Sequence, residues 1–124
     1  MLDNAELVAF LACSDLTRAE GFFGGVLGLE HVETTAYAAV FRSGATTLRV
    51  TLVEQVTPAP YTVLGWTVPD IRAGLMALAE RGVPAVRFGG LPQDGDGVWT
   101  TPDGSRVAWF HDPDGHLLSL TQLA

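Results

Sequence analysis

The chain has 124 residues, 48% of them hydrophobic, and carries seven arginines, no lysine and fourteen aspartates and glutamates, for a net charge of −7. This length suits one domain or two small units that share a core, and the apolar content excludes intrinsic disorder. The charge balance provides no basic surface for binding nucleic acid.

Two further features argue against a membrane or secreted protein. The longest apolar run, Leu7–Cys13, is far shorter than the roughly 20 residues that span a bilayer, and the acidic N-terminus does not resemble a signal peptide. Cys13 is the single cysteine, so we expect no internal disulfide and no cysteine-based zinc site. We therefore expect a cytoplasmic protein that does not engage membranes.

The first half of the chain predicts a strand, a helix and then further strands. An apolar strand at residues 6–13 is followed by Ser14 and Asp15, whose short side chains are typical helix N-caps. Apolar residues recur at helical spacing over residues 16–27, although Gly24 and Gly25 weaken this helix, and Gly28 ends it. Strand-like runs follow at 29–34, 37–42 and 46–54.

The same order repeats 55 residues later, after a linker at residues 56–60. A strand at 61–68 leads to a Pro69-Asp70 cap and to an amphipathic helix that begins at Ile71 and ends at Gly82. The remaining strand-like runs are 85–88, 98–101, 106–111 and 117–122, and the Gly-rich loop at 89–97 is expected to be mobile. Each half thus reads β-α-β-β-β, with module one at 5–55 and module two at 61–124.

Paired modules of this kind, together with the run Phe110-His111-Asp112-Pro113-Asp114-Gly115-His116-Leu117-Leu118-Ser119-Leu120, resemble the vicinal oxygen chelate superfamily. That superfamily includes glyoxalase I, extradiol dioxygenases and bleomycin-binding resistance proteins. Ser14-Asp15-Leu16 and Leu27-Gly28-Leu29 also match its pattern. The resemblance implies one α+β domain over residues 1–124, with curled antiparallel sheets forming an open cup and helices outside. It also implies a homodimer, because a second subunit usually completes the cup.

The metal ligands of the superfamily's enzymes are missing from the matching positions. Those enzymes typically use a histidine early in the first strand of each half and a glutamate in its last strand. The matching residues here are Val8, Val63 and Ser119, with Thr51 or, less directly, Arg49 at the fourth position. None of these supplies an imidazole or carboxylate, so we expect no metal and no cofactor.

Two alternatives to this expectation remain open. His111 and His116 bracket a turn and could hold a metal at the rim of a sheet. Glu54 could face the cup if the register of its strand is offset.

Strand alternation predicts which side chains face the cup. Trp66 is expected to pack beneath a helix, whereas Trp99 could act as a lid or lie at a dimer contact. The predicted ligand-binding residues are the aromatic Phe10, Tyr61 and Trp109 and the polar Arg49, Thr51, Ser119 and Thr121. Apolar walls with sparse polar groups are typical of a small-molecule site.

The favoured function is that of a metal-free binding protein resembling the bleomycin resistance members. It would sequester an aromatic or cationic antibiotic or metabolite. The alternative is a lyase, isomerase, dioxygenase or transferase that uses a relocated metal or acid–base chemistry by His111 or Glu54. A third interpretation is an accessory dimer whose cup is filled by its own side chains.

Overall fold

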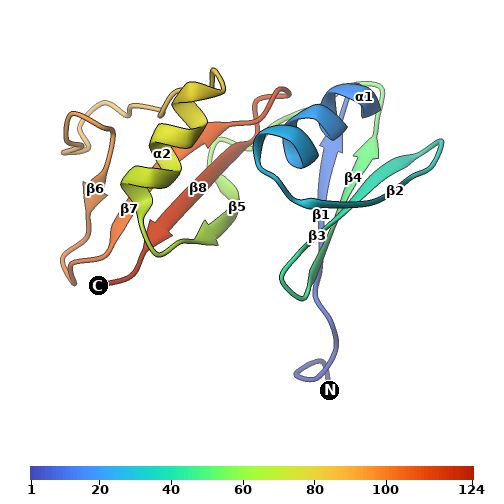
Figure 1. Cartoon of the computed structure of the whole chain (residues 1–124), viewed down its shortest axis with the longest axis horizontal. Helices are drawn as coiled ribbons and strands as arrows, with labels where there is room; N and C mark the ends of the chain where they lie inside the picture. The colour runs from blue at the N-terminus through green and yellow to red at the C-terminus, as the bar shows by residue number, and fades with distance from the viewer. The chain divides into compact units, whose positions relative to one another are not determined.

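The computed structural model describes all residues, 1–124, and divides them into two compact units, Met1–Thr57 and Pro58–Ala124 (Figure 1). The boundary between the units falls within the expected linker, residues 56–60. No helix in either unit has the length and apolar character needed to cross a membrane.

Unit 1 is a four-stranded sheet with helical turns on one face. The strands lie in the order β1-β4-β3-β2. Helix α1 contacts β4 and β3, and helix η1 contacts β3 and β2. The elements are β1(Val8–Cys13), α1(Leu16–Ala19), the π-helix η1(Glu20–Val26), β2(Glu30–Thr34), β3(Ala38–Ser43) and β4(Thr46–Leu52).

The helix expected at residues 16–27 is present as two consecutive segments of different geometry. Asp15 caps α1 by accepting a hydrogen bond from the Arg18 N–H at 3.0 Å, as its residue type predicts. After Ala19 the chain continues as a π-helix. This wider helix is rare in proteins compared with the α-helix. Gly21, Gly24 and Gly25 all lie in this segment and weaken its α-helical preference.

Unit 2 repeats this plan with a longer helix. Its strands lie in the order β5-β8-β7-β6, and α2 contacts β7 and β8 (Figure 1). Asp70 caps α2 by accepting hydrogen bonds from the Arg72 and Ala73 N–H groups, both at 3.1 Å. The elements are β5(Thr62–Thr67), α2(Ile71–Glu80), β6(Trp99–Thr100), β7(Arg106–His111) and β8(Leu117–Gln122).

The predicted α+β class with two β-α-β-β-β modules is confirmed, but the sheets are mixed rather than wholly antiparallel. β1 runs parallel to β4, and β5 runs parallel to β8, whereas the other neighbouring strands are antiparallel. Parallel neighbours cannot be joined by a tight turn, and the chain between them runs here through the helix and two further strands of each module. The three later strands of each module then follow one another as an antiparallel meander.

The strand expected at residues 85–88 is absent. This segment follows Pro84 and forms no strand, although the Val86 N–H donates to the Trp109 carbonyl at 2.8 Å. The side chain of Gln93 bonds the Phe88 N–H at 2.8 Å and the Val86 carbonyl at 2.9 Å. A side chain thus satisfies the backbone groups that a strand partner would otherwise satisfy.

Each sheet buries one face against its helices and leaves the other face uncovered by them. In unit 1, Phe23 of η1 contacts Phe41, and both are almost fully buried. In unit 2, α2 comes so close to β8 that a Cβ at Gly74 would lie 3.0 Å from Leu120. We call the opposite sides of the two sheets the uncovered faces of unit 1 and unit 2.

Candidate functional site

Strand register decides which side chains share the uncovered face of unit 2, because paired residues of neighbouring strands point to the same side. Trp109 pairs with Ser119, which pairs with Gly65, and Trp99 pairs with Val107, which pairs with Thr121. The predicted residues Trp109, Ser119 and Thr121 therefore lie on one face, together with Trp99.

Three aromatic rings come together on this side of the sheet. The rings of Trp99 and Trp109 are near-parallel, with an interplanar angle of 25° and centroids 6.3 Å apart. Phe88 meets Trp109 edge-on, with centroids 5.1 Å apart. We call Phe88, Trp99 and Trp109 the aromatic cluster. Both tryptophans are only half-buried, so part of each indole stays accessible to a ligand.

A threonine that the sequence did not single out holds Trp109 in place. The Trp109 Nε1–H donates to the Thr62 Oγ1 at 3.0 Å. Strict alternation along β5 would turn Thr62 away, but the register with β8 shifts between Thr62 and Leu64. This β-bulge places Thr62 on the same face as Gly65. Nothing in the sequence marks the bulge, so alternation alone could not have found Thr62.

Strand alternation does not fix the direction of Tyr61 or Val63. Tyr61 lies just before β5 with 66% of its surface exposed, and it pairs with no strand residue. Val63 is the unpaired residue of the bulge. The predicted contribution of Tyr61 to a binding face therefore does not follow from strand register.

Gly65 and Ser119 form the floor beside Trp109. Ser119 is buried, and a Cβ at position 65 would overlap its hydroxyl group. A glycine is thus required at position 65 to admit the Ser119 side chain. Thr121, one row further along, is half-buried between its register partners Thr67 and Val107.

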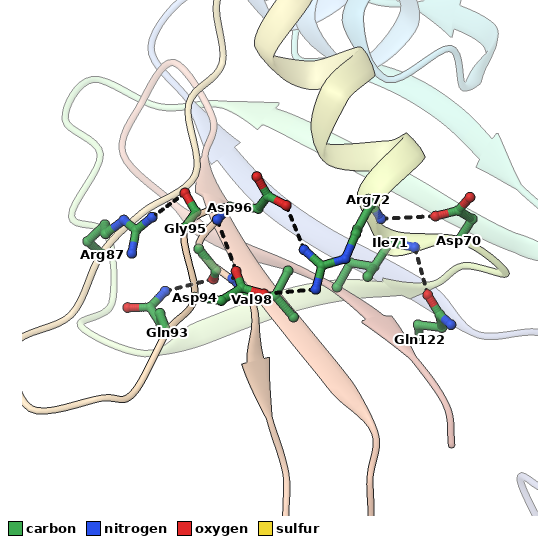
Figure 2. Close-up of polar contacts among 11 residues, drawn as sticks. Asp70, Ile71, Arg72, Arg87, Gln93, Asp94, Gly95, Asp96, Val98 and Gln122 are labelled. Atoms are coloured by element: carbon green, nitrogen blue, oxygen red, sulfur yellow. Dashed lines mark hydrogen bonds and ion pairs between the residues drawn. The ribbon is translucent and has the colours of Figure 1, made fainter.

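The loop that precedes Trp99 is tied to α2 rather than free of contacts. Arg72 of α2 donates to Asp96 at 2.6 Å and to Asp94 at 2.8 Å (Figure 2). Asp94 also accepts hydrogen bonds from the Asp96 and Val98 N–H groups. The Arg72 guanidinium, followed by the Val98 N–H, lowers the pKa of Asp94 to about 2.

The predicted residues of unit 1 also share one face. Phe10 of β1 and Val40 of β3 flank Arg49 of β4, and Ala12 pairs with Thr51. Phe10 is 64% exposed, whereas Arg49 and Thr51 are half-buried. Phe10, Arg49 and Thr51 therefore lie on the uncovered face of unit 1.

The residues present do not fit a divalent metal ion. Val8 shares the uncovered face with Phe10, and Val63 lies in the bulge, so neither expected histidine position offers a donor. No group of three or more His, Cys, Asp or Glu side chains converges anywhere in the chain. A metal site of the vicinal oxygen chelate kind would need such a donor set.

The turn between His111 and His116 is organised by an aspartate rather than by a metal site. The Asp112 carboxylate accepts hydrogen bonds from the Asp114 N–H at 3.1 Å and from the His116 N–H at 2.8 Å. Asp112 is buried, and this burial raises its pKa. His116 is buried as well, whereas His111 is exposed at the end of β7.

Comparison with known proteins identifies the family. The family model described as glyoxalase/bleomycin resistance protein/dioxygenase superfamily matches residues 6–120. The chain belongs to this superfamily. No curated protein matches the chain.

Several solved structures share this fold at low sequence identity. A member from Sphaerobacter thermophilus is 22% identical, has a TM-score of 0.75, and aligns over 98% of this chain and 99% of its own. A lactoylglutathione lyase from Agrobacterium tumefaciens is 18% identical, has a TM-score of 0.74, and aligns over 96% and 93%. TnmS3, an antibiotic binding protein from Streptomyces, is 21% identical, has a TM-score of 0.73, and aligns over 100% and 99%.

The structures similar to this chain include both a lyase and an antibiotic binding protein at comparable similarity. The fold therefore does not decide between catalysis and binding, and function has to be argued from the side chains.

Proposed function

We propose that this protein is a metal-free binding protein that sequesters a planar aromatic or cationic small molecule, such as an antibiotic or metabolite. The observation that carries the proposal is the aromatic cluster, in which two near-parallel, half-buried indoles stand on a sheet face that no helix covers. Indole faces attract flat π systems and cations, typically by about 0.5–2 kcal/mol for each contact. The net charge of −7 would draw cations toward the protein.

In this proposal the uncovered face of each unit is a binding surface of its own. On unit 2 the contacts would come from Trp109, Ser119, Thr121 and the nearby Tyr61, and on unit 1 from Phe10, Arg49 and Thr51. This mixture of apolar walls and a few polar groups is what small-molecule sites generally offer. Trapping a ligand in this way needs affinity alone and no catalytic base.

The enzymatic alternative has less support from the side chains. The His111 ring makes no hydrogen bond or ion pair that would orient it as a base, and Glu54 is an exposed residue that follows β4. General acid–base catalysis needs a positioned group within reach of a reacting atom.

The proposal also includes a homodimer in the cytoplasm. β1 is an edge strand of unit 1 that pairs only with β4, and its Val8–Cys13 sequence carries neither charge nor proline to protect the edge. Leu7 and Val8, at the start of this edge, also expose apolar surface. Cys13 is buried and forms no disulfide, as suits a reducing compartment.

The test of the binding proposal measures the fluorescence anisotropy of acridine orange, a planar cation, during titration with the protein. We expect Trp109→Ala to weaken binding at least tenfold and Trp109→Phe, which keeps a ring, to weaken it less. Trp66→Phe is the matched control, because Trp66 stacks on Phe110 of the helix-covered face, at a centroid distance of 6.4 Å. Equal affinity of the Trp109→Ala and Trp66→Phe variants would refute the proposed site.

A further inference from the structure

Arg49 is a half-buried cation that has no partner within the protein. Its guanidinium makes no hydrogen bond and no ion pair. By contrast, Arg72 pairs with two aspartates and Arg42 with Glu30. Arg18, Arg81 and Arg87 each donate to a hydroxyl or carbonyl oxygen. Arg106 is the other arginine without such a contact, but it is exposed to solvent.

The surroundings of Arg49 contain no carboxylate. Strand register places eight side chains around it on the uncovered face of unit 1: Val8, Phe10, Ala12, Ala38, Val40, Arg42, Thr47 and Thr51. The nearest acidic residue in its row is Glu33, which lies beyond Val40. That is two strand spacings away, or roughly 10 Å.

This environment is unfavourable for an isolated cation. Partial removal of a guanidinium from water costs free energy unless an anion or a set of hydrogen-bond acceptors replaces the water. Fourteen acidic residues are present in the chain, yet none is placed beside Arg49. A ligand that brings its own anion would supply the missing partner.

We propose that Arg49 binds the carboxylate of a small aromatic acid whose ring packs against Phe10. The planar guanidinium fork matches a carboxylate with two parallel hydrogen bonds, and Thr47 and Thr51 offer hydroxyl groups on either side along the same strand. Phe10 is the register partner of Arg49 and is 64% exposed, so it offers an aromatic surface next to the charge. This inference rests on the proposed binding function and specifies the chemistry of the ligand that the uncovered face of unit 1 would take.

The overall negative charge does not prevent an acid from binding here. At physiological ionic strength, charges are screened over about 8 Å, so the nearest groups dominate. The charged side chains among the neighbours of Arg49 are limited to Arg42, and this arginine lies 3.8 Å from Glu30, which partly neutralises it.

The test is isothermal titration calorimetry with benzoate and with benzamide, a neutral molecule of similar shape. Calorimetry is suitable because all three tryptophans lie in unit 2 and would not report on unit 1. We expect the unchanged protein to bind benzoate at least tenfold more tightly than benzamide. Arg49→Gln should weaken benzoate binding at least tenfold, and Arg49→Lys should weaken it less. Arg106→Gln is the matched control, because it removes an arginine charge without affecting the proposed site.

A second measurement separates a ligand-binding arginine from a structural one. Without ligand, Arg49→Met should raise the Tm by a few degrees, because it replaces an unpartnered half-buried charge by an apolar side chain of similar length. Benzoate should raise the Tm of the unchanged protein but not of Arg49→Met.

The possible failures are distinguishable. If benzoate does not bind, or binds equally to the unchanged protein and Arg49→Gln, while acridine orange still depends on Trp109, the carboxylate inference is wrong and the proposed function stands. If acridine orange binding does not depend on Trp109 either, the proposed function fails as well. A Tm that falls in Arg49→Met would show that Arg49 stabilises the fold, and this would also overturn the inference.

Discussion

Thr62 determines what the Trp109 indole can offer to a ligand. Its hydroxyl accepts the only hydrogen bond that the indole N–H can donate, over 3.0 Å. With this donor occupied, a ligand meets the π surface of Trp109 rather than its N–H. The contact also joins β5 to β7 across β8, because these strands are not neighbours in the sheet.

Thr62→Val should therefore loosen Trp109 without removing it. Valine has nearly the same shape as threonine but cannot accept the hydrogen bond, so we expect the free energy of unfolding to fall by about 0.5–1.5 kcal/mol. Urea denaturation measures this loss, and the NMR signal of the Trp109 indole N–H should shift. The control is Thr67→Val on the same strand and face, since Thr67 makes no hydrogen bond to an indole. A loss no larger than that of the control would contradict the role of Thr62.

Sequence reasoning at the residue scale succeeded where strands are regular. Alternation predicts that Trp109, Ser119 and Thr121 share one face. This holds in the structure because β7 and β8 pair without interruption from Arg106 to Gln122. It missed Thr62 because a bulge changes which face a side chain takes, and bulges depend on pairing that local sequence does not specify. It also could not show that Arg49 lacks a partner, since ion pairs depend on residues far apart in the chain.

At the scale of elements, the segment between α2 and β6 is more ordered than its glycine-rich composition predicts. Four glycines in residues 89–97 predict a mobile loop, yet Gln93 and Asp94 organise it with side-chain hydrogen bonds. Gly97 has a φ of +89°, and a Cβ there would lie 2.8 Å from Ala85, so this glycine serves a close backbone approach. The ties to Arg72 hold the loop that leads into Trp99 (Figure 2). The sequence contains these polar residues but does not reveal their partners.

The tie between Arg72 and Asp94 should give the loop a pH dependence. The folded pKa of Asp94 is about 2, below its ordinary value of 3.8, so its stabilising effect is present above pH 4 and is lost as the pH falls toward 2. Because the side chains are about 40–50% exposed, solvent screening keeps this contribution small.

We expect Asp94→Asn to lower the free energy of unfolding at pH 5 and to make little difference near pH 2. Urea denaturation followed by tryptophan fluorescence measures both values. Asp3→Asn, which changes an exposed aspartate in unit 1, is the control. The same deficit for Asp94→Asn at both pH values would show that the ion pair does not stabilise the loop.

At the scale of the whole molecule, the repeat of one module explains why so much of the fold could be predicted. Asp15 and Asp70 cap the first helix of their modules, as their residue types and spacing indicate. The same order of strand, cap and helix occurs twice in the chain. This repeat limits the number of possible topologies far more than either pattern alone. The parallel pairing of β1 with β4 and of β5 with β8 is a property of the assembled sheet, and alternation within single strands carries no information about it.

The unprotected edge of β1 leads to the prediction for the oligomeric state. We expect the protein to sediment as a dimer at micromolar concentration, because an apolar edge strand beside the exposed Leu7 and Val8 favours association. Leu7→Glu should weaken the dimer at least tenfold, about 1.4 kcal/mol, by placing a charge on that surface.

Met76→Glu is the matched control, since Met76 and Leu7 are similarly exposed, at 64% and 70%, but Met76 lies on α2 of unit 2. Sedimentation velocity measures all three proteins. A monomer at 100-fold higher concentration would rule out association through this edge. Equal weakening by the two substitutions would instead attribute association to general surface charge, because the net charge of −7 already opposes the approach of a second copy.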